Sequence, residues 1–234
     1  MQNSELEEIE VIFFDLDDTL FDQQKAHEIA LREINNRYDV FEKVDLKEIT
    51  QAFKEADDEA IDEFRNGIPM EDLRFNRSEK VLKKLGVDED FTETFHEEFY
   101  RLYPSTPVEI EGTKEVIEYL APNYELGILS NSTEDIQMKK VRALNLTDYF
   151  DTLIFSEEVD SRKPDEGIFL HALDKVDKSS DSCLYVGNSY RSDIKGAKRV
   201  GMKTCWLNSD QKKKGDARKP DLEIRNLREL LEIF

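Results

Sequence analysis

Three aspartates follow a run of four apolar residues near the start of the chain, and their spacing makes them the first candidates for chemistry. The run covers residues 11–14, and Asp15, Asp17 and Asp18 come directly after it. Such a short run without a polar face is typical of a strand buried on both sides of a parallel sheet. Clustered carboxylates repel one another unless a cation, a proton or a reaction requires them together. Ligands bind beyond the carboxyl ends of strands in open α/β sheets, so we favour a reactive site over a turn that merely caps a helix.

Polar residues also follow three later segments that are predicted to be strands. These strands are expected over 124–129, 152–155 and 183–186, and the polar residues beyond them are Ser130 and Asn131, Lys163, and Asn188 with Asp193. Parallel strands share a direction, so their carboxyl ends lie along one edge of the sheet. We therefore expect these side chains to meet the aspartates there.

The residue types suggest a separate chemical role for each of these side chains. A carboxylate such as Asp15 can attack an electrophile, and a second one two residues later, Asp17, can protonate a leaving oxygen. The serine and asparagine at 130–131 can donate hydrogen bonds to a small anion. Lys163, in a loop fixed by the following proline, can balance negative charge. Asp193 can bind or orient a hard divalent cation such as magnesium.

The helices and strands that must position these residues are predicted to form one α/β domain with an insertion. For about eighty residues after Leu20, apolar residues recur at helical spacing in four segments joined by short links, which predicts a small helical bundle. From Gly112 onward helices alternate with strands, and a last strand is expected over 203–207. We predict a Rossmann-like three-layer core with a parallel sheet over residues 1–20 and 105–234. An inserted α-helical bundle cap would occupy residues 21–104.

Charge and composition narrow the range of partners. The chain of 234 residues carries a formal charge of −20, which argues against binding a nucleic acid polymer or an anionic membrane surface. An anionic substrate would then need a local counter-charge. The two cysteines, Cys183 and Cys205, fall in predicted strands and are expected to be core residues in a reducing compartment. Without an apolar run near the roughly 20 residues of a membrane span, or a signal-like N-terminus, we expect a cytoplasmic protein.

Four motifs in this order resemble the haloacid dehalogenase-like (HAD) hydrolase superfamily. Residues 15–19 match its Asp-x-Asp-x-Thr motif, and residues 128–131 match its apolar strand ending in Ser or Thr. Residues 163–165 are similar to its lysine in a Lys-Pro context. Residues 187–193 match its Gly-Asp-x(4)-Asp motif except at Asn188, where the family has aspartate. The helical bundle stands where the family inserts its cap, so the resemblance covers the whole chain.

The resemblance implies a role for each matched residue. Asp15 would form an aspartyl-phosphate, Asp17 would act as general acid and then base, and Lys163 would neutralise charge around Asp15. Thr19 would shape the loop and steady the nucleophile. The phosphoryl group would be bound by Ser130, with the backbone of Asn131 helping.

The resemblance also implies a magnesium ion. The Asp15 carboxylate and the Asp17 backbone carbonyl would be two of its ligands. Asn188 offers only a neutral carbonyl oxygen where the family has a carboxylate. Either Asp193 then binds the metal directly, or magnesium binds more weakly, or activity has been lost in favour of binding.

We predict a Mg²⁺-dependent phosphomonoester hydrolase of a small phosphorylated metabolite, either a nucleotide or a sugar phosphate, working as a monomer or homodimer. A halide leaves without a proton, and the true dehalogenases lack an acid two residues after the nucleophile, so Asp17 argues against dehalogenation. A β-phosphoglucomutase-like phosphotransferase and a catalytically weak HAD-fold binding protein remain as alternatives. Within the superfamily the chain looks similar to the helical-cap branch of pyrimidine 5'-nucleotidases, with phosphoglycolate and sugar phosphatases in related branches.

Overall fold

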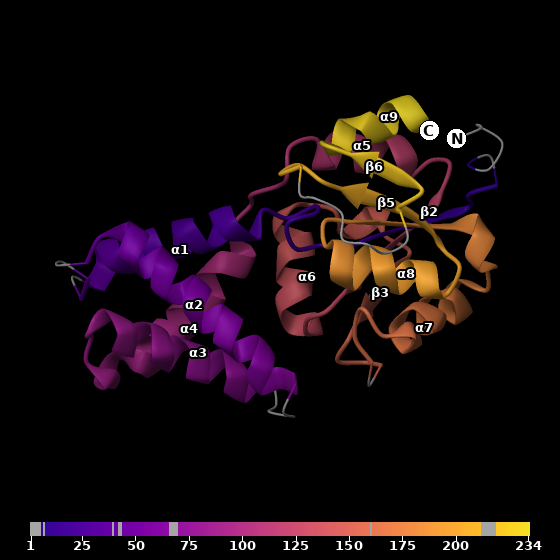
Figure 1. Cartoon of the computed structure of the whole chain (residues 1–234). Coiled ribbons are helices and arrows are strands. Elements are labelled where there is room, and N and C mark those ends of the chain that lie inside the picture. Colours follow the sequence, from indigo (N-terminus) through magenta and orange to yellow (C-terminus); the bar gives the residue numbers. More distant parts are fainter. Residues whose placement is uncertain are drawn as a thin grey trace. The chain divides into compact units, whose positions relative to one another are not determined.

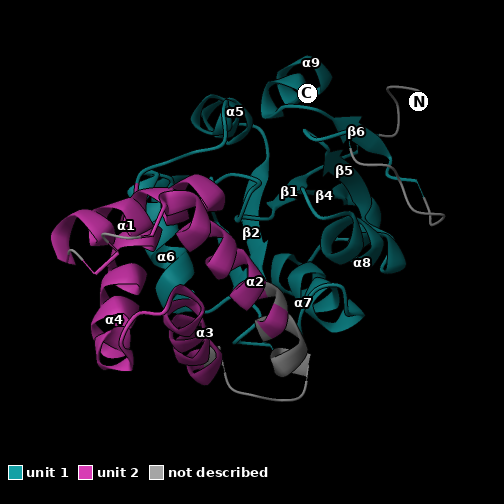
Figure 2. Cartoon of the chain, turned by 60° about the vertical axis from the view of Figure 1, so that its left-hand side comes forward, with its two compact units in different colours: residues 1–22, 107–234 teal, residues 23–106 magenta. Residues whose placement is uncertain are grey.

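The computed structural model describes residues 6, 8–38, 40–41, 44–65, 70–159, 161–211 and 219–234. The chain divides into two compact units (Figure 2). Unit 1 comprises residues 1–22 and 107–234, and unit 2 comprises residues 23–106. Unit 2 is thus an insertion within the sequence of unit 1.

Unit 1 is built on a parallel six-stranded sheet with the order β3-β2-β1-β4-β5-β6. Its strands are β1 Val11–Phe14, β2 Glu125–Ser130, β3 Thr152–Phe155, β4 Cys183–Gly187, β5 Lys203–Leu207 and β6 Leu222–Ile224. From β1 the chain builds outward through β2 and β3 on one side, and then through β4, β5 and β6 on the other. The order therefore reverses between β1 and β4, the kind of position where open α/β sheets bind ligands.

Helices cover both faces of this sheet. They are α5 Thr113–Leu120, α6 Glu134–Ala143, α7 Glu166–Val176, α8 Lys195–Arg199 and the terminal α9 Leu230–Ile233. Figure 1 shows α5 and α9 on one side of the sheet and α7 and α8 on the other. The central strand β1 is fully buried, as its uninterrupted apolar sequence predicts.

One face of the core shows how the central strands are packed. Phe13 of β1 and Tyr185 of β4 pack with Phe169 of α7 and Ala197 of α8 in one buried cluster. The rings of Phe169 and Tyr185 meet edge-on, with their centroids 5.4 Å apart. The predicted α/β class with a parallel, three-layer core is confirmed. Both cysteines are buried, Cys183 in β4 and Cys205 in β5.

Two local features differ from the sequence-based expectation. The short edge strand β6 was not predicted, because three residues with a glutamate in the middle show no clear period. Residues 191–200 follow a predicted strand and, in the helix–strand alternation, are predicted to form a regular helix, but the segment begins instead as a π-helical turn, Tyr190–Ile194, before α8. π-Helical turns are rare and occur often at functional sites.

The described part of unit 2 contains four α-helices: α1 Gln23–Tyr38, α2 Leu46–Arg65, α3 Met70–Leu85 and α4 Thr92–Leu102. Single 3₁₀ turns stand before and after α4, over Glu89–Phe91 and Tyr103–Ser105. Aromatic residues fill its interior, with the rings of Phe53 and Phe99 4.4 Å apart. His27 packs against both rings and against Tyr103. No helix among the described residues combines the length and apolar character needed to cross a membrane.

Candidate active site

The nucleophile candidate, Asp15, is the first residue after β1 and lies at the reversal of strand order. Its backbone N–H donates to the Val186 carbonyl of β4 at 2.9 Å, so the residue is fixed to the neighbouring strand. One carboxylate oxygen, Oδ1, is 2.6 Å from the Lys163 ammonium. The other, Oδ2, accepts a hydrogen bond from the Thr19 hydroxyl at 3.2 Å. Only 7% of Asp15 is exposed, so both contacts are made in a largely dry environment.

A tight loop after Asp15 brings Thr19 back onto it. The Leu16 carbonyl lies within hydrogen-bond distance of three successive backbone N–H groups, those of residues 19–21. Asp18 takes a left-handed conformation, with φ of 55°, which aspartate tolerates better than most residues. Thr19 is fully buried, and its hydroxyl also accepts from the Asn188 N–H at 3.1 Å. The two contacts suit Thr19 to shaping the loop and steadying Asp15 rather than to binding substrate through its hydroxyl.

Lys163 is buried among three oxygen atoms. Its Nζ lies 2.6 Å from Asp15 Oδ1, 2.8 Å from the Tyr185 hydroxyl and 2.7 Å from Asp193 Oδ1. The contact with Asp193 is a close ion pair without hydrogen-bond alignment, because Asp193 Oδ1 has no hydrogen-bond partner. Burial by itself favours neutral lysine, but the charges of Asp15 and Asp193 outweigh it and raise the pKa of Lys163 well above its usual value. Lys163 is therefore a permanent cation at this site.

Asn131 positions Lys163 through its side-chain amide. Its Oδ1 accepts from the Lys163 N–H at 2.7 Å, and its Nδ2 donates to the Lys163 carbonyl at 2.8 Å. Both ends of the amide are thus committed to the lysine loop. Any contact of Asn131 with substrate would have to come from its backbone, as the family resemblance implied.

The segment after β4 brings Asp193 against the strand end. Asp193 is 1% exposed, and its Oδ2 accepts from the Ser189 N–H at 2.9 Å. A Cβ atom at Gly187 would lie 2.5 Å from the same oxygen, so the close approach requires glycine there. The backbone of Asn188 donates to Thr19 and accepts from the Trp206 indole at 3.0 Å. The loop therefore holds Asn188 through its main chain.

Asp17 lies on the other side of the loop and contacts helix α6. Its Oδ1 is 2.5 Å from the Lys140 ammonium, and its Oδ2 accepts from the Gln137 amide at 2.9 Å. The same Gln137 nitrogen donates to the Ser130 hydroxyl at 2.7 Å. A quarter of the Asp17 side chain remains exposed. The general-acid candidate and the phosphoryl-binding candidate are therefore joined by one side chain.

Sequence analysis missed three residues of this site: Tyr185, Gln137 and Lys140. A tyrosine inside a buried apolar strand signals a hydroxyl that needs a partner, and Tyr185 does donate to the Leu129 carbonyl at 2.9 Å. Gln137 and Lys140 stand three residues apart, on one face of the helix that follows Ser130. Both are buried there, although polar side chains normally face solvent.

The surroundings of Asp15 disfavour its ionised carboxylate unless further positive charge is nearby. Burial raises the pKa of Asp15 to about 7; Lys163 lowers it, while Asp193 and Asp17 add to the rise. A nearby divalent cation would favour the ionised carboxylate. The residues at hand offer hard oxygen donors, namely two carboxylates at Asp15 and Asp193 and a carbonyl oxygen at Asn188.

This donor set fits magnesium better than metals that need several protein ligands. The described residues include no group of three or more His, Cys, Asp or Glu that could hold a metal ion by themselves. Magnesium usually keeps several waters and binds through one or two carboxylates. The buried Oδ1 of Asp193 is ion-paired with Lys163 but accepts no hydrogen bond, so it keeps lone pairs for a cation.

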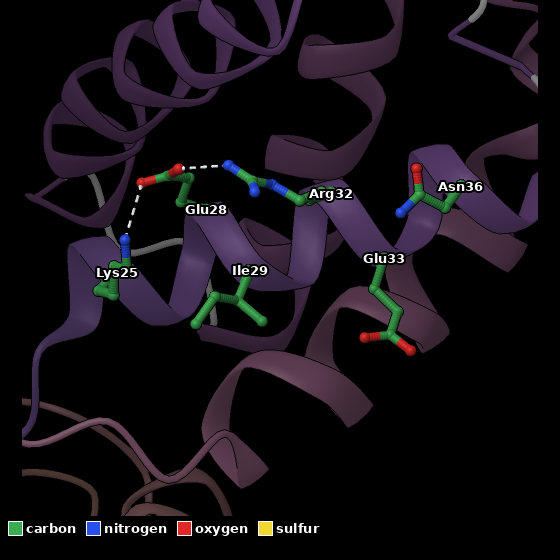
Figure 3. Close-up of a pocket in the computed structure, with 6 residues that line it drawn as sticks. All are labelled: Lys25, Glu28, Ile29, Arg32, Glu33 and Asn36. Carbon is green, nitrogen blue, oxygen red and sulfur yellow. Dashed lines mark hydrogen bonds and ion pairs between the residues drawn. The ribbon is translucent and has the colours of Figure 1, made fainter.

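A pocket of about 210 Å³ lies elsewhere, on unit 2 (Figure 3). It is lined by residues of helix α1, namely Lys25, Glu28, Ile29, Arg32, Glu33 and Asn36. Glu28 pairs with Lys25 at 3.8 Å and with Arg32 at 2.9 Å. The lining is a solvated helix face with its own ion pairs, and it includes none of the predicted site residues.

Fold and site together describe an α/β domain with a buried carboxylate, Asp15, directly after its first strand. The model of the haloacid dehalogenase-like hydrolase family matches residues 12–207. The chain belongs to this family, which confirms the resemblance inferred from the motifs.

Named phosphatases are among its relatives. Pyrimidine 5'-nucleotidase YjjG of Escherichia coli is 28% identical over 95% of this chain and 96% of its own. Glyceraldehyde 3-phosphate phosphatase of Pyrococcus abyssi is 33% identical over 85% of this chain and 81% of its own. The predicted enzyme class, a hydrolase of the HAD phosphatase type, is confirmed by these relatives.

Solved structures share the fold across almost the entire chain. YfnB of Bacillus subtilis, in a crystal structure bound to magnesium, has a TM-score of 0.83 and 27% identity, covering 96% of this chain and 98% of its own. A 2-haloacid dehalogenase of Pseudomonas syringae has a TM-score of 0.65 and 30% identity, covering 96% and 97%. The fold thus serves more than one reaction, and the site must decide which one applies.

The network around Thr19 generates a stability prediction. Thr19→Val removes the hydroxyl and leaves the Asn188 N–H and one Asp15 oxygen without this partner, so the free energy of unfolding should fall by about 1–3 kcal/mol. Thr19→Ser keeps the hydroxyl and loses one methyl group, which should cost about 0.8 kcal/mol. Urea unfolding of both variants measures the difference. A Thr19→Val variant as stable as the wild type would show that the hydroxyl contacts contribute nothing.

Proposed function

We propose that this chain is a Mg²⁺-dependent phosphomonoester hydrolase that acts on a small phosphorylated metabolite through an aspartyl-phosphate on Asp15. The observation that carries the proposal is the pair of carboxylates on one loop, Asp15 and Asp17, each beside its own buried lysine. A nucleophile and a separate acid are what the ester of an alcohol requires. A halide leaves without a proton, so a dehalogenase has no use for the second carboxylate.

In the first step an Asp15 carboxylate oxygen attacks phosphorus, and the bond from phosphorus to the ester oxygen breaks. Asp17 gives its proton to that oxygen, so the alcohol leaves neutral. The Ser130 hydroxyl accepts from Gln137, which leaves its own hydrogen to donate to a phosphoryl oxygen. Lys163 offsets the negative charge that gathers around Asp15.

In the second step water attacks phosphorus, and the bond from phosphorus to Asp15 breaks. Asp17 now takes a proton from the water, which restores both carboxyl groups to their starting states and releases inorganic phosphate. Thr19 and Lys163 receive the Asp15 carboxylate again in its original position. When bound, magnesium would be held by Asp15, the Asp17 carbonyl and Asn188 or Asp193, and would supply positive charge against the phosphoryl oxygens.

The relatives support a small phosphate ester as the substrate. They include enzymes named for a pyrimidine nucleotide and for glyceraldehyde 3-phosphate, so we propose a nucleotide or sugar phosphate. The helical unit is inserted after β1, where the family places its cap, and we propose that it governs substrate choice. A phosphotransferase of the β-phosphoglucomutase type uses the same two carboxylates, and release of inorganic phosphate distinguishes hydrolysis from it.

The first prediction concerns the nucleophile. Asp15→Asn should abolish phosphate release from 4-nitrophenyl phosphate, because a carboxamide cannot form the acyl-phosphate. The wild type, but not the variant, should form a beryllofluoride adduct on Asp15 that is visible by fluorine NMR. Circular dichroism serves as the folding control. Substantial turnover by folded Asp15→Asn would disprove the mechanism.

The second prediction concerns the acid. Asp17→Asn should lower kcat/KM, which reports the step that expels the alcohol, by about 10²–10⁴-fold for phenyl phosphate, whose leaving group needs a proton. The loss should be smaller for 4-nitrophenyl phosphate, whose leaving group is already stable as an anion. Steady-state rates on both esters give the ratio. Losses of the same size on both would assign Asp17 a structural role.

The third prediction concerns the metal. Asn188→Asp should lower the magnesium concentration needed for half-maximal activity, since a carboxylate attracts a divalent ion more strongly than a neutral carbonyl does. Repulsion from Asp15 and Asp193 opposes this gain, but the cation would lie closer to the new charge than those carboxylates do. Asn188→Ala, titrated in parallel, should raise the requirement. An unchanged requirement in both variants would make Asp193 the better ligand candidate.

A further inference from the structure

A second buried lysine, Lys140 of helix α6, lies at the site and has no part in the steps above. It is 1% exposed, and its Nζ is 2.5 Å from Asp17 Oδ1 and 5.3 Å from the centre of the Phe21 ring. Lysine is almost never fully buried unless it is paired. Its charge is therefore directed at Asp17, the residue that must exchange protons in both steps.

Gln137, one helical turn earlier, holds the other oxygen of the same carboxylate. Its two amide hydrogens go to Asp17 Oδ2 at 2.9 Å and to the Ser130 hydroxyl at 2.7 Å. Its Oε1 is buried without a hydrogen-bond partner. The opposite amide orientation would place this oxygen against the Asp17 carboxylate and repel it, so the orientation of Gln137 is fixed.

We infer that Lys140 is a positioning residue for Asp17, and that Gln137 sets the position of Asp17 relative to Ser130. The inference rests on the proposed function, because it assigns Asp17 the acid–base role. With one donor on each oxygen, the carboxylate cannot rotate without losing a contact. A carboxylate has about four lone-pair sites, so two donors leave room for the catalytic proton.

The geometry links the acid to the phosphoryl site. Ser130 ends strand β2 and α6 begins four residues later, so one short segment carries the phosphoryl-binding hydroxyl and both residues that hold the acid. If Asp17 only formed a stabilising ion pair with Lys140, a contact at one of its two oxygens would be enough. The second contact comes from Gln137, which also binds Ser130. It therefore fixes the distance between Asp17 and the phosphoryl site, over which the proton must pass to the ester oxygen.

The test compares Lys140→Met with Lys139→Met, which changes an exposed lysine on the same helix. Lys140→Met should lower kcat/KM for phenyl phosphate, which reports the step that expels the alcohol, by about 10- to 100-fold, the range expected from a misplaced catalytic group. The loss on 4-nitrophenyl phosphate should be smaller, and KM should change little for either ester. Lys140→Arg, which keeps the charge, should recover part of the loss, and Lys139→Met should behave as the wild type.

The decisive comparison is made in the Asp17→Asn background. If Lys140 acts through Asp17, the double variant should be no slower than Asp17→Asn alone, because coupled residues are not additive. The comparison of the double variant with Asp17→Asn still tests the inference if Lys140→Met by itself fails to fold, because the double variant leaves no unpaired Asp17 charge. Thermal unfolding of every variant confirms the folded state.

The outcomes separate this inference from the proposed function. Multiplicative losses in the double variant, or equal losses on both esters, would mean that Lys140 acts on the phosphoryl group directly and would overturn the inference. Lys140→Met matching Lys139→Met would overturn it as well. A wild type without turnover, or an active Asp15→Asn, would reject the proposed function and the inference together.

Discussion

The buried ammonium of Lys163 is the interaction on which the site depends. Without it, Asp15 and Asp193 would face each other in a largely dry environment, where carboxylates take up protons instead of staying charged. Asn131 fixes the lysine main chain, and Tyr185 supplies a third oxygen to the ammonium. These groups come from the ends of β1 and β2, the loop after β3, β4 itself and the turn after β4. The contacts of Lys163 therefore form only when strands β1 to β4 are paired.

The reversal of strand order gives this assembly its geometry. Because β1 and β4 are neighbours, the loops after them leave the sheet side by side, and the Thr19 hydroxyl joins the two by contacting both Asp15 and Asn188. All the site residues belong to unit 1, even though the helical unit separates Asp15 from the rest along the chain. The insertion after β1 therefore leaves these residues together within one unit.

The two carboxylates of the site, Asp15 and Asp17, have equivalent sets of hydrogen-bond and ion-pair partners. Asp15 has Lys163 and the Thr19 hydroxyl as donors, and Asp17 has Lys140 and the Gln137 amide. Each carboxylate is thus held at both oxygens by one cation and one neutral group. The difference is exposure, since Asp15 is nearly buried whereas a quarter of the Asp17 side chain reaches solvent. That difference fits the proposed roles, in which Asp15 is a dry nucleophile and Asp17 is an acid that exchanges protons with water.

The sequence by itself determined five of the six strands and the edge at which the polar residues gather. Uninterrupted apolar runs made strands such as 11–14 and 152–155 recognisable, because burial on both faces leaves no polar position. The polar residues at their ends followed from the shared direction of parallel strands. Tertiary structure alone decided which groups serve Asp17, and that the amide of Asn131 binds the lysine backbone. The physical reason is that these contacts join residues about 30 or more positions apart, and local periodicity records only which face is buried, not what it meets.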